Sequence, residues 1–367
     1  MSKEIREHQE PFVRMVKRAS IEPKKAWLIR GIALLGAIIT GGLLILTLGH
    51  NPFEVYASMV QGAFGKKIAI QETVKLTIPL LITGIGISLA FKMRFWNIGA
   101  EGQILAGAIA ASSIAIYFDH LPHAIVLILM GLAAFIAGGI YGMIPAFFKA
   151  KWNTNETLFT LMMNYIALQF VIFLEHQASW QDSRSTFPKV RMFTDTARLP
   201  KVFGVHIGWI IALIIVVAAF IYLTKTKHGY EISVVGESTN TARYAGMNVR
   251  RILVRTMFLS AALAGLVGFL QVSGSDGTLT ETTAGGVGFT AITVAWLGHM
   301  NPFAMVVVSL FIAMLERGSN SIQTSHNIPA SAADLLTGLI LFFMLGCEFF
   351  INYKLIFRGS RKEEANG

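Results

Sequence analysis

The sequence has 367 residues, of which 54% are hydrophobic and only 14% are charged, and its mean hydropathy is +0.58. Soluble domains carry about 25% charged residues, so this composition excludes an ordinary soluble protein and indicates a polytopic membrane protein. The single cysteine, Cys347, excludes an intramolecular disulfide and a zinc cluster built from thiolates. The net charge of +10 does not require nucleic acid as a partner, because the positive-inside rule explains basic residues beside apolar segments.

The N-terminal residues 1–28 are charged, contain Pro11 and Pro23, and lack the apolar core of a signal peptide. We therefore expect a retained cytosolic tail at this end. A transmembrane domain is expected over residues 29–355, and a short cytosolic tail over residues 356–367.

A helix needs about 20 apolar residues to cross the hydrocarbon core of a membrane. The segments that meet or approach this length are 29–48, 76–91, 98–118, 124–148, 157–175, 207–223, 256–272 and 332–351. Two further apolar segments, 288–298 and 303–316, are too short to cross as straight helices, so we expect them to be tilted, broken or re-entrant. The predicted fold is all-α, with about ten transmembrane or partly re-entrant helices and broken helices near the membrane midplane.

Basic residues predict the orientation of these spans. If the N-terminus is inside, ten crossings return the C-terminus to the same side. The inside segments are then 1–28, 92–97, 149–156, 224–255, 299–302 and 352–367. Together with Arg30 they hold 22 of the 31 Lys and Arg residues, which favours cytoplasmic termini. The loop 176–206 is also basic, although this topology assigns it to the outside.

Residues 92–110, KMRFWNIGAEGQILAGAIA, interrupt the apolar pattern with a polar, glycine-rich turn that carries Asn97, Glu101 and Gln103. Such a cluster inside a membrane protein is costly unless protein or a water-filled cavity surrounds it, which favours a place on a transport pathway. The alternative is structural: Asn97 caps the helix, and the Glu101 carboxylate bonds local amides, where a helix dipole contributes about 0.3–1 kcal/mol.

A second glycine-rich polar turn, residues 274–288, precedes the short apolar segment 288–298. Discontinuous helices of this kind expose backbone dipoles to a pathway. Elsewhere, Asn164 either bonds a neighbouring helix or lines the pathway. Aromatic rings near these turns, Trp96 among them, either stack on a planar ligand or only pack. The candidate pathway residues are Phe95, Asn97, Glu101, Gln103, Asn164, Phe289 and Trp296.

The longest inside connection is the loop 224–255. Ser238 or Thr239 is a plausible N-cap for a short helix from Thr241 to Tyr244, and Gly246 would end that helix in a left-handed conformation. A short capped helix suits docking of a soluble partner, whereas a basic loop held near anionic headgroups is the alternative.

Several motifs of enzymes and nucleotide-binding proteins are missing. Residues 62–67 resemble a P-loop superficially, but the spacing fails, so the chain is not expected to hydrolyse ATP. Neither an H-E-x-x-H motif nor a nucleophile elbow occurs. We therefore expect no enzyme, no catalytic residue, no cofactor and no metal site.

Three motifs resemble a known family. FWNIGAEGQILAGA (95–108) is similar to the signature of permease subunits of bacterial ABC importers in the branched-chain amino acid, ribose and nucleoside group. NETLFTLMMNYIA (155–167) and GESTNTARYAGMN (236–248) resemble the nucleoside branch, which works with a basic-membrane-protein type lipoprotein. The last motif departs from many relatives, which have Asn-Pro before Ala-Ala-Arg-Tyr.

The resemblance implies a permease in the bacterial plasma membrane, forming one half of a core with an identical or homologous second permease. It also implies an ABC ATPase with tandem nucleotide-binding domains, a substrate-binding lipoprotein and contact with membrane lipid, but no nucleic acid. The residues that would couple the chain to the ATPase are Gly236, Glu237, Ala242, Arg243, Tyr244, Gly246 and Asn248. Ribose-type sugars or branched-chain amino acids are alternative substrates. A secondary transporter that uses intramembrane carboxylates is the alternative of another class.

Overall fold

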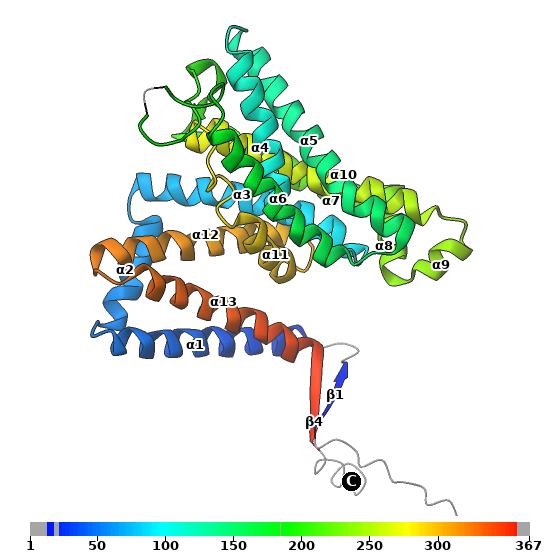
Figure 1. Ribbon diagram of the computed structural model, residues 1–367. Helices are drawn as coiled ribbons and strands as arrows, with labels where there is room; N and C mark the ends of the chain where they lie inside the picture. The colour runs from blue at the N-terminus through cyan, green and yellow to red at the C-terminus, as the bar shows by residue number, and fades with distance from the viewer. Residues whose placement is uncertain (1–12, 18–21, 184, 358–367) are drawn as a thin grey trace, which may run out of the picture. The chain divides into compact units, whose positions relative to one another are not determined.

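The computed structural model describes residues 13–17, 22–183 and 185–357 (Figure 1). Among these residues, nine helices are long and apolar enough to cross a membrane. They are α1 (Pro23–Thr47), α3 (Lys67–Lys92), α4 (Ala100–Tyr117), α5 (His123–Trp152), α6 (Glu156–Glu175), α7 (Gly208–Lys225), α10 (Val249–Leu270, continued by the π-helical turn η2, Gln271–Asp276), α12 (Pro302–Ser325) and α13 (Ala330–Asn352). The all-α polytopic fold expected from the sequence is therefore confirmed.

Shorter elements connect these helices. The helical ones are α2 (Pro52–Phe64), α8 (Lys227–Glu237), α9 (Thr239–Tyr244), α11 (Val287–Leu297) and the 3₁₀ turn η1 (Asp195–Ala197). The strands are β1 (Val13–Lys17), β2 (Lys201–Val202), β3 (Val205–His206) and β4 (Tyr353–Phe357).

One expectation about span length was wrong. The segment 303–316 was expected to be too short to cross, but α12 runs for 24 residues, to Ser325. Apolar counting stops at Glu316 and Arg317, although the polar residues that follow can remain helical when neighbouring protein covers them. Gly318, for example, lies so close to Met59 that an added Cβ would be 3.0 Å from the Met59 carbonyl oxygen.

The chain divides into two compact units. The first comprises residues 1–57 and 322–367, of which α1, α13 and the β1–β4 pair are described. The two strands are antiparallel, with Val13 opposite Phe357 and Lys17 opposite Tyr353. This pairing brings the start of α1 and the end of α13 close together.

The second unit, residues 58–321, is built around α3, α4, α5 and α10 (Figure 1). Small residues let these backbones approach closely. An added Cβ at Gly107 of α4 would overlap the backbone of Gly265 in α10, and one at Gly138 of α5 would overlap the same residue. Membrane helices gain no hydrophobic driving force from associating in lipid, so their association depends on close packing of the kind that these glycines allow.

At one end of this unit, three of the segments predicted to lie inside come together. They line a pocket of about 400 Å³ that includes Arg94 from the α3–α4 turn, Asn153 from the α5–α6 turn and Ser238 between α8 and α9. Lys149 and Glu156 beside it form an ion pair with an N–O distance of 2.9 Å. Their meeting at one end agrees with the predicted topology.

The segment between α6 and α7 covers the opposite end of this unit. Its Phe193 amide donates to the Gly277 carbonyl at 2.8 Å, and its Leu199 amide donates to the Ser273 carbonyl at 3.0 Å. Its Arg191 guanidinium donates to the carbonyl that ends α4, at Ile116, at 2.7 Å. Helix α10 therefore runs from the end that carries α8 and α9 to this covered end.

Residues 277–297 lead from the end covered by the α6–α7 segment back toward the α3–α4 turn. Near their start, the Thr278 hydroxyl donates to the Val190 carbonyl at 2.9 Å, in the covering segment. Near their finish, Trp296 of α11 stacks on Trp96 of the α3–α4 turn, with ring centroids 5.8 Å apart. This stretch combines a loop with the short helix α11, which agrees with the expectation that 288–298 is too short to cross as a straight helix.

Candidate functional site

Glu101 joins the starts of α4 and α11, the helices that follow the two glycine-rich polar turns. It lies in the first turn of α4, and its two carboxylate oxygens accept the amides of Gly286 and Gly288, each at 2.7 Å. These amides belong to the start of α11, whose N-terminal dipole favours a negative charge there. The carboxylate thus bonds a helix distant in sequence, where the structural interpretation anticipated local amides.

Asn97 and Gln103 form a buried amide pair behind this contact. The Asn97 Nδ2 donates to the Gln103 Oε1 at 3.1 Å, and the Gln103 Nε2 donates to the Asn97 Oδ1 at 3.0 Å. The same Asn97 oxygen accepts the Gly99 amide at 3.1 Å, and its nitrogen reaches the Ser260 hydroxyl of α10 at 3.4 Å. Both side chains are thereby occupied in fixing the turn before α4.

Asn164 of α6 holds this turn from another side. Its Oδ1 accepts the Gly102 amide at 2.8 Å, and its Nδ2 donates to the Ile98 carbonyl at 2.9 Å. Phe95 is buried, with 1% of its surface exposed. In this conformation Phe95, Asn97, Gln103 and Asn164 all face protein.

The two remaining pathway candidates lie on an exposed face of α11. Phe289 and Trp296 are seven residues apart, two helical turns, and expose 44% and 41% of their surfaces. Trp96, 43% exposed, stacks on Trp296 with an interplanar angle of 23°, and Phe91 packs against both rings. The structure therefore gathers an aromatic face on the helix that Glu101 holds.

The predicted coupling residues lie in and beside α9. The Ser238 hydroxyl accepts the Thr241 amide at 3.2 Å and caps the helix, and Gly246 follows it with a φ of +75°. Ala242 is buried, whereas Tyr244 is 93% exposed. The Asn248 side chain caps α10 by accepting the Arg251 amide at 3.1 Å.

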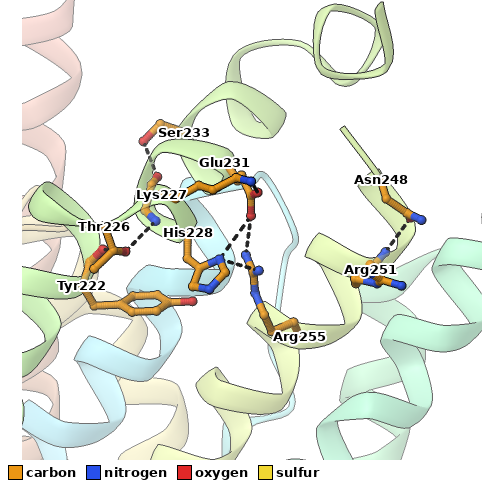
Figure 2. Close-up of polar contacts among 10 residues, drawn as sticks. Tyr222, Thr226, Lys227, His228, Glu231, Ser233, Asn248, Arg251 and Arg255 are labelled. Carbon is orange, nitrogen blue, oxygen red and sulfur yellow. Dashed lines mark hydrogen bonds and ion pairs between the residues drawn. The ribbon is translucent and has the colours of Figure 1, made fainter. Parts of the chain in front are cut away.

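Helix α8, which precedes α9, was not predicted and is held by a polar clasp (Figure 2). We use the name clasp for the contacts among His228 and Glu231 of α8 and Arg255 of α10. Arg255 Nη2 lies 2.9 Å from Glu231 Oε2, and Arg255 Nη1 donates to His228 Nδ1. Burial raises the pKa of Glu231, but the hydrogen bonds and charges of Arg255 and His228 lower it further, to a net value below its usual range.

The C-terminal end of α8 touches the end of α3. An added Cβ at Gly236 would overlap the carbonyl oxygen of Lys92, the last residue of α3. Because the chain continues from Lys92 through Trp96 to Glu101, this approach connects the end of α8 with the turn before α4. Gly236 is thus a predicted coupling residue at which packing leaves no room for a side chain.

Sequence inspection did not find the clasp. A signal was present, because Ile232 and Val235 are spaced by three residues and both are buried, which is typical of one helical face. The polar residues on α8 mask this pattern, and the pairing of Glu231 with Arg255 crosses 24 positions.

Comparisons with known proteins agree with this arrangement. Residues 69–345 match the family model described as branched-chain amino acid transport system/permease component. The chain is 32% identical to the glucose ABC transporter permease protein TsgB13 of Haloferax volcanii, with 91% of this chain and 93% of that protein covered. It is 30% identical to the guanosine ABC transporter permease protein NupP of Bacillus subtilis, with 90% and 94% covered.

A third relative is the nucleoside ABC transporter permease protein NupB of Lactococcus lactis, 29% identical over 88% of this chain and 92% of that protein. Permeases of this kind do not carry out catalysis themselves and work with an ABC ATPase and a substrate-binding protein. The family model and the relatives cover the broken helices, the clasp and α9 together. The chain accordingly belongs to the branched-chain amino acid transport system/permease component family and is a multi-pass, non-catalytic subunit of an ABC transporter.

Proposed function

We propose that this chain is the permease subunit of an ATP-driven importer for nucleosides. Substrate crosses by alternating access while a separate subunit hydrolyses ATP. The observation that carries this proposal is α9, a capped helix that leaves Tyr244 93% exposed and follows the clasp-held helix α8. A rigid helix with an unburied aromatic ring supports docking of a soluble protein.

In this proposal, Arg243 and Tyr244 contact the ATPase, while Ser238 and Gly246 set the two ends of the helix they occupy. Gly236 and Asn248 fix the helices on either side, Ala242 packs α9 inward, and Glu237 lies at the joint between α8 and α9. Movement imposed on α9 would reach α3 through the close approach of Gly236 to Lys92.

For the pathway, we propose that the aromatic face of α11 meets the substrate. Phe289, Trp296 and Trp96 offer flat rings on which a nucleobase can stack. Asn97, Glu101, Gln103, Asn164 and Phe95 would form the frame that holds this face. A second permease, identical or homologous, would complete the passage.

The proposed surroundings follow from the same topology. The end with α9 would face the cytoplasm of a bacterium, together with both termini, which is supported by the excess of Lys and Arg on the inside segments. An ATPase with tandem nucleotide-binding domains docks at that end, and a lipoprotein delivers substrate at the other.

A glucose importer is the second candidate, because one relative with 32% identity is a glucose permease. Guanosine and nucleoside permeases among the relatives favour nucleosides. Aromatic faces suit both, since sugars also pack on rings. The two substrates are therefore distinguished by experiment rather than by the shape of α11.

The test is uptake of labelled guanosine and of labelled glucose into proteoliposomes that hold the permease, its partner permease, its ATPase and its lipoprotein. We expect guanosine uptake that needs ATP, and loss of both uptake and ATPase docking in R243A/Y244A. The matched control K201A/F203A removes an exposed cation and an exposed ring from the opposite end, and it should keep the ATPase bound. Uptake by the permease alone under an ion gradient would overturn the proposal, and glucose uptake without guanosine uptake would establish the second candidate.

A further inference from the structure

A pocket of about 570 Å³ is lined by α10, by Asn248 before it and by Met143 of α5, and it is separate from the aromatic face. Its floor is apolar, made by Met143 of α5 and by Val254 and Phe258 of α10. Three arginines of α10, Arg250, Arg251 and Arg255, also line it. The pocket therefore joins an apolar surface to a concentration of positive charge.

Two of these arginines make no side-chain hydrogen bond or ion pair among the described residues. The side chains of Arg250 and Arg251 are exposed, and neither guanidinium bonds another residue within the part of the chain that the structure describes. Figure 2 shows that the backbone amide of Arg251, rather than its guanidinium, donates to Asn248. Of the three arginines, Arg255 is the one that takes part in the clasp. Even Arg255 keeps its Nε buried without a partner among the described residues.

The floor of the pocket lies in the last part of α5 and the first part of α10. Phe258 lies nine residues after Val249, the first residue of α10, and Met143 lies nine residues before Trp152, the last of α5. At 1.5 Å per residue, both floor residues are about 13 Å from those helix ends. The Lys151 ammonium sits over the Trp152 ring at 4.5 Å, and a basic and aromatic belt of this kind marks a membrane interface.

We propose that this pocket binds an anionic phospholipid. Its phosphate would accept hydrogen bonds from Arg250 and Arg251, and an acyl chain would cover Val254, Phe258 and Met143. Guanidinium groups bind phosphate with two parallel hydrogen bonds, and basic pockets between transmembrane helices are suited to lipid headgroups. A soluble anion would leave the apolar floor bare, so the floor favours a lipid over free phosphate.

The site requires only that α5 and α10 span the membrane, and it does not depend on the substrate. It adjoins the clasp, because Arg255 both lines the pocket and pairs with Glu231. A bound lipid would therefore lie beside the contact that holds α8 against α10.

The test uses the full chain, purified in detergent and stripped of lipid. Native mass spectrometry measures binding of dioleoylphosphatidylglycerol, dioleoylphosphatidylcholine and glycerol 3-phosphate to wild type and variants. We expect phosphatidylglycerol to bind R250A/R251A about thirtyfold more weakly than wild type, since two cations near the surface are removed. R250K/R251K keeps both charges and should stay within about fivefold of wild type.

The matched control is K66A/K67A, which removes two adjacent exposed cations from the α2–α3 turn and should bind within about twofold of wild type. The proposal is overturned if wild type binds phosphatidylcholine as tightly as phosphatidylglycerol. It is also overturned if R250A/R251A and K66A/K67A weaken binding of phosphatidylglycerol equally. It is also overturned if glycerol 3-phosphate displaces the lipid, because the pocket would then be a site for soluble anions.

Discussion

Glu101 and Gly288 are 187 residues apart in sequence, yet the carboxylate of one accepts the amide of the other at 2.7 Å. The second carboxylate oxygen takes the amide of Gly286 at the same distance. One side chain at the start of α4 thus satisfies two amides at the start of α11, the helix that carries Phe289 and Trp296. The position of the aromatic face depends on this carboxylate.

Replacing Glu101 should therefore affect both stability and transport. E101A leaves two amides without an acceptor, and each unsatisfied group costs about 1–3 kcal/mol, so we expect destabilisation of roughly 2–6 kcal/mol together with a large loss of uptake. E101Q keeps one acceptor and should be intermediate. Denaturant unfolding in detergent and uptake in proteoliposomes measure the two effects.

The control for this change is E281A, which removes an exposed carboxylate from the loop before α11. The Glu281 contact with Glu175 uses the backbone amide, so the substitution preserves it. We expect wild-type stability and uptake from this control. An E101A protein that also behaved as wild type would show that α11 is held by other contacts.

The clasp offers a prediction about coupling rather than stability. E231Q weakens the ion pair with Arg255 while keeping the size of the side chain, and Arg255 remains exposed enough to solvate its charge. We expect ATP hydrolysis to continue while the amount of nucleoside transported per ATP falls severalfold. The measurement is simultaneous ATPase activity and uptake in one preparation.

Charge exchange tests whether the pair itself matters. The double variant E231R/R255E restores an ion pair with the opposite direction and should recover part of the lost transport per ATP, whereas either single reversal should not. Equal ratios of transport to hydrolysis in wild type, E231Q and the single reversals would contradict a role for the clasp.

The positions of the spans were largely predictable, and their polar contacts were not. Apolar length depends on neighbouring residues in the chain, so α5, α7 and α13 were found from local composition alone. The distribution of Lys and Arg placed the turns at Arg94, Asn153 and Ser238 on one side, and the three turns do lie together; the side itself stays a prediction. These properties are local, or depend on sums along the chain.

Contacts between distant segments escape such reasoning. Asn164 was interpreted as a residue that either bonds another helix or lines the pathway, and its partners at Gly102 and Ile98 lie 62 and 66 positions away. Helix α8 was missed because its apolar face has only a few members. The length of α12 was underestimated because protein, rather than lipid, covers its polar end.

His206 gives a prediction about pH. Its ring is buried at the covered end of the second unit, where its Nδ1 accepts the Gly208 amide at 3.2 Å. Burial lowers the pKa of His206 to about 4, and the positive charge of Lys75 lowers it in the same direction. The folded protein therefore keeps this ring neutral at pH values where an unfolded histidine is protonated.

The sign follows from this difference. Above pH 6.5 the ring is neutral in both states, so the full stability is present. Stability is lost as pH falls from 6.5 toward 4, because the unfolded state binds the proton first, and the total loss is roughly 3 kcal/mol. Denaturant midpoints between pH 7 and pH 4.5 measure it, and H206Q should flatten that dependence. A variant that kept the slope of wild type would place its origin at another group.

Gly236 provides the sharpest steric test of the link between α8 and α3. Its missing side chain leaves space for the Lys92 carbonyl, so G236A forces the two backbones apart although alanine favours a helix. Gly338 of α13 has open space around it, which makes G338A a matched control that should be neutral or slightly stabilising. We expect G236A to reach the membrane and bind the ATPase, because α9 itself is unchanged, but to lose most ATP-driven uptake. If G236A transports as well as G338A, the approach of α8 to α3 does not carry motion from α9 to the broken helices.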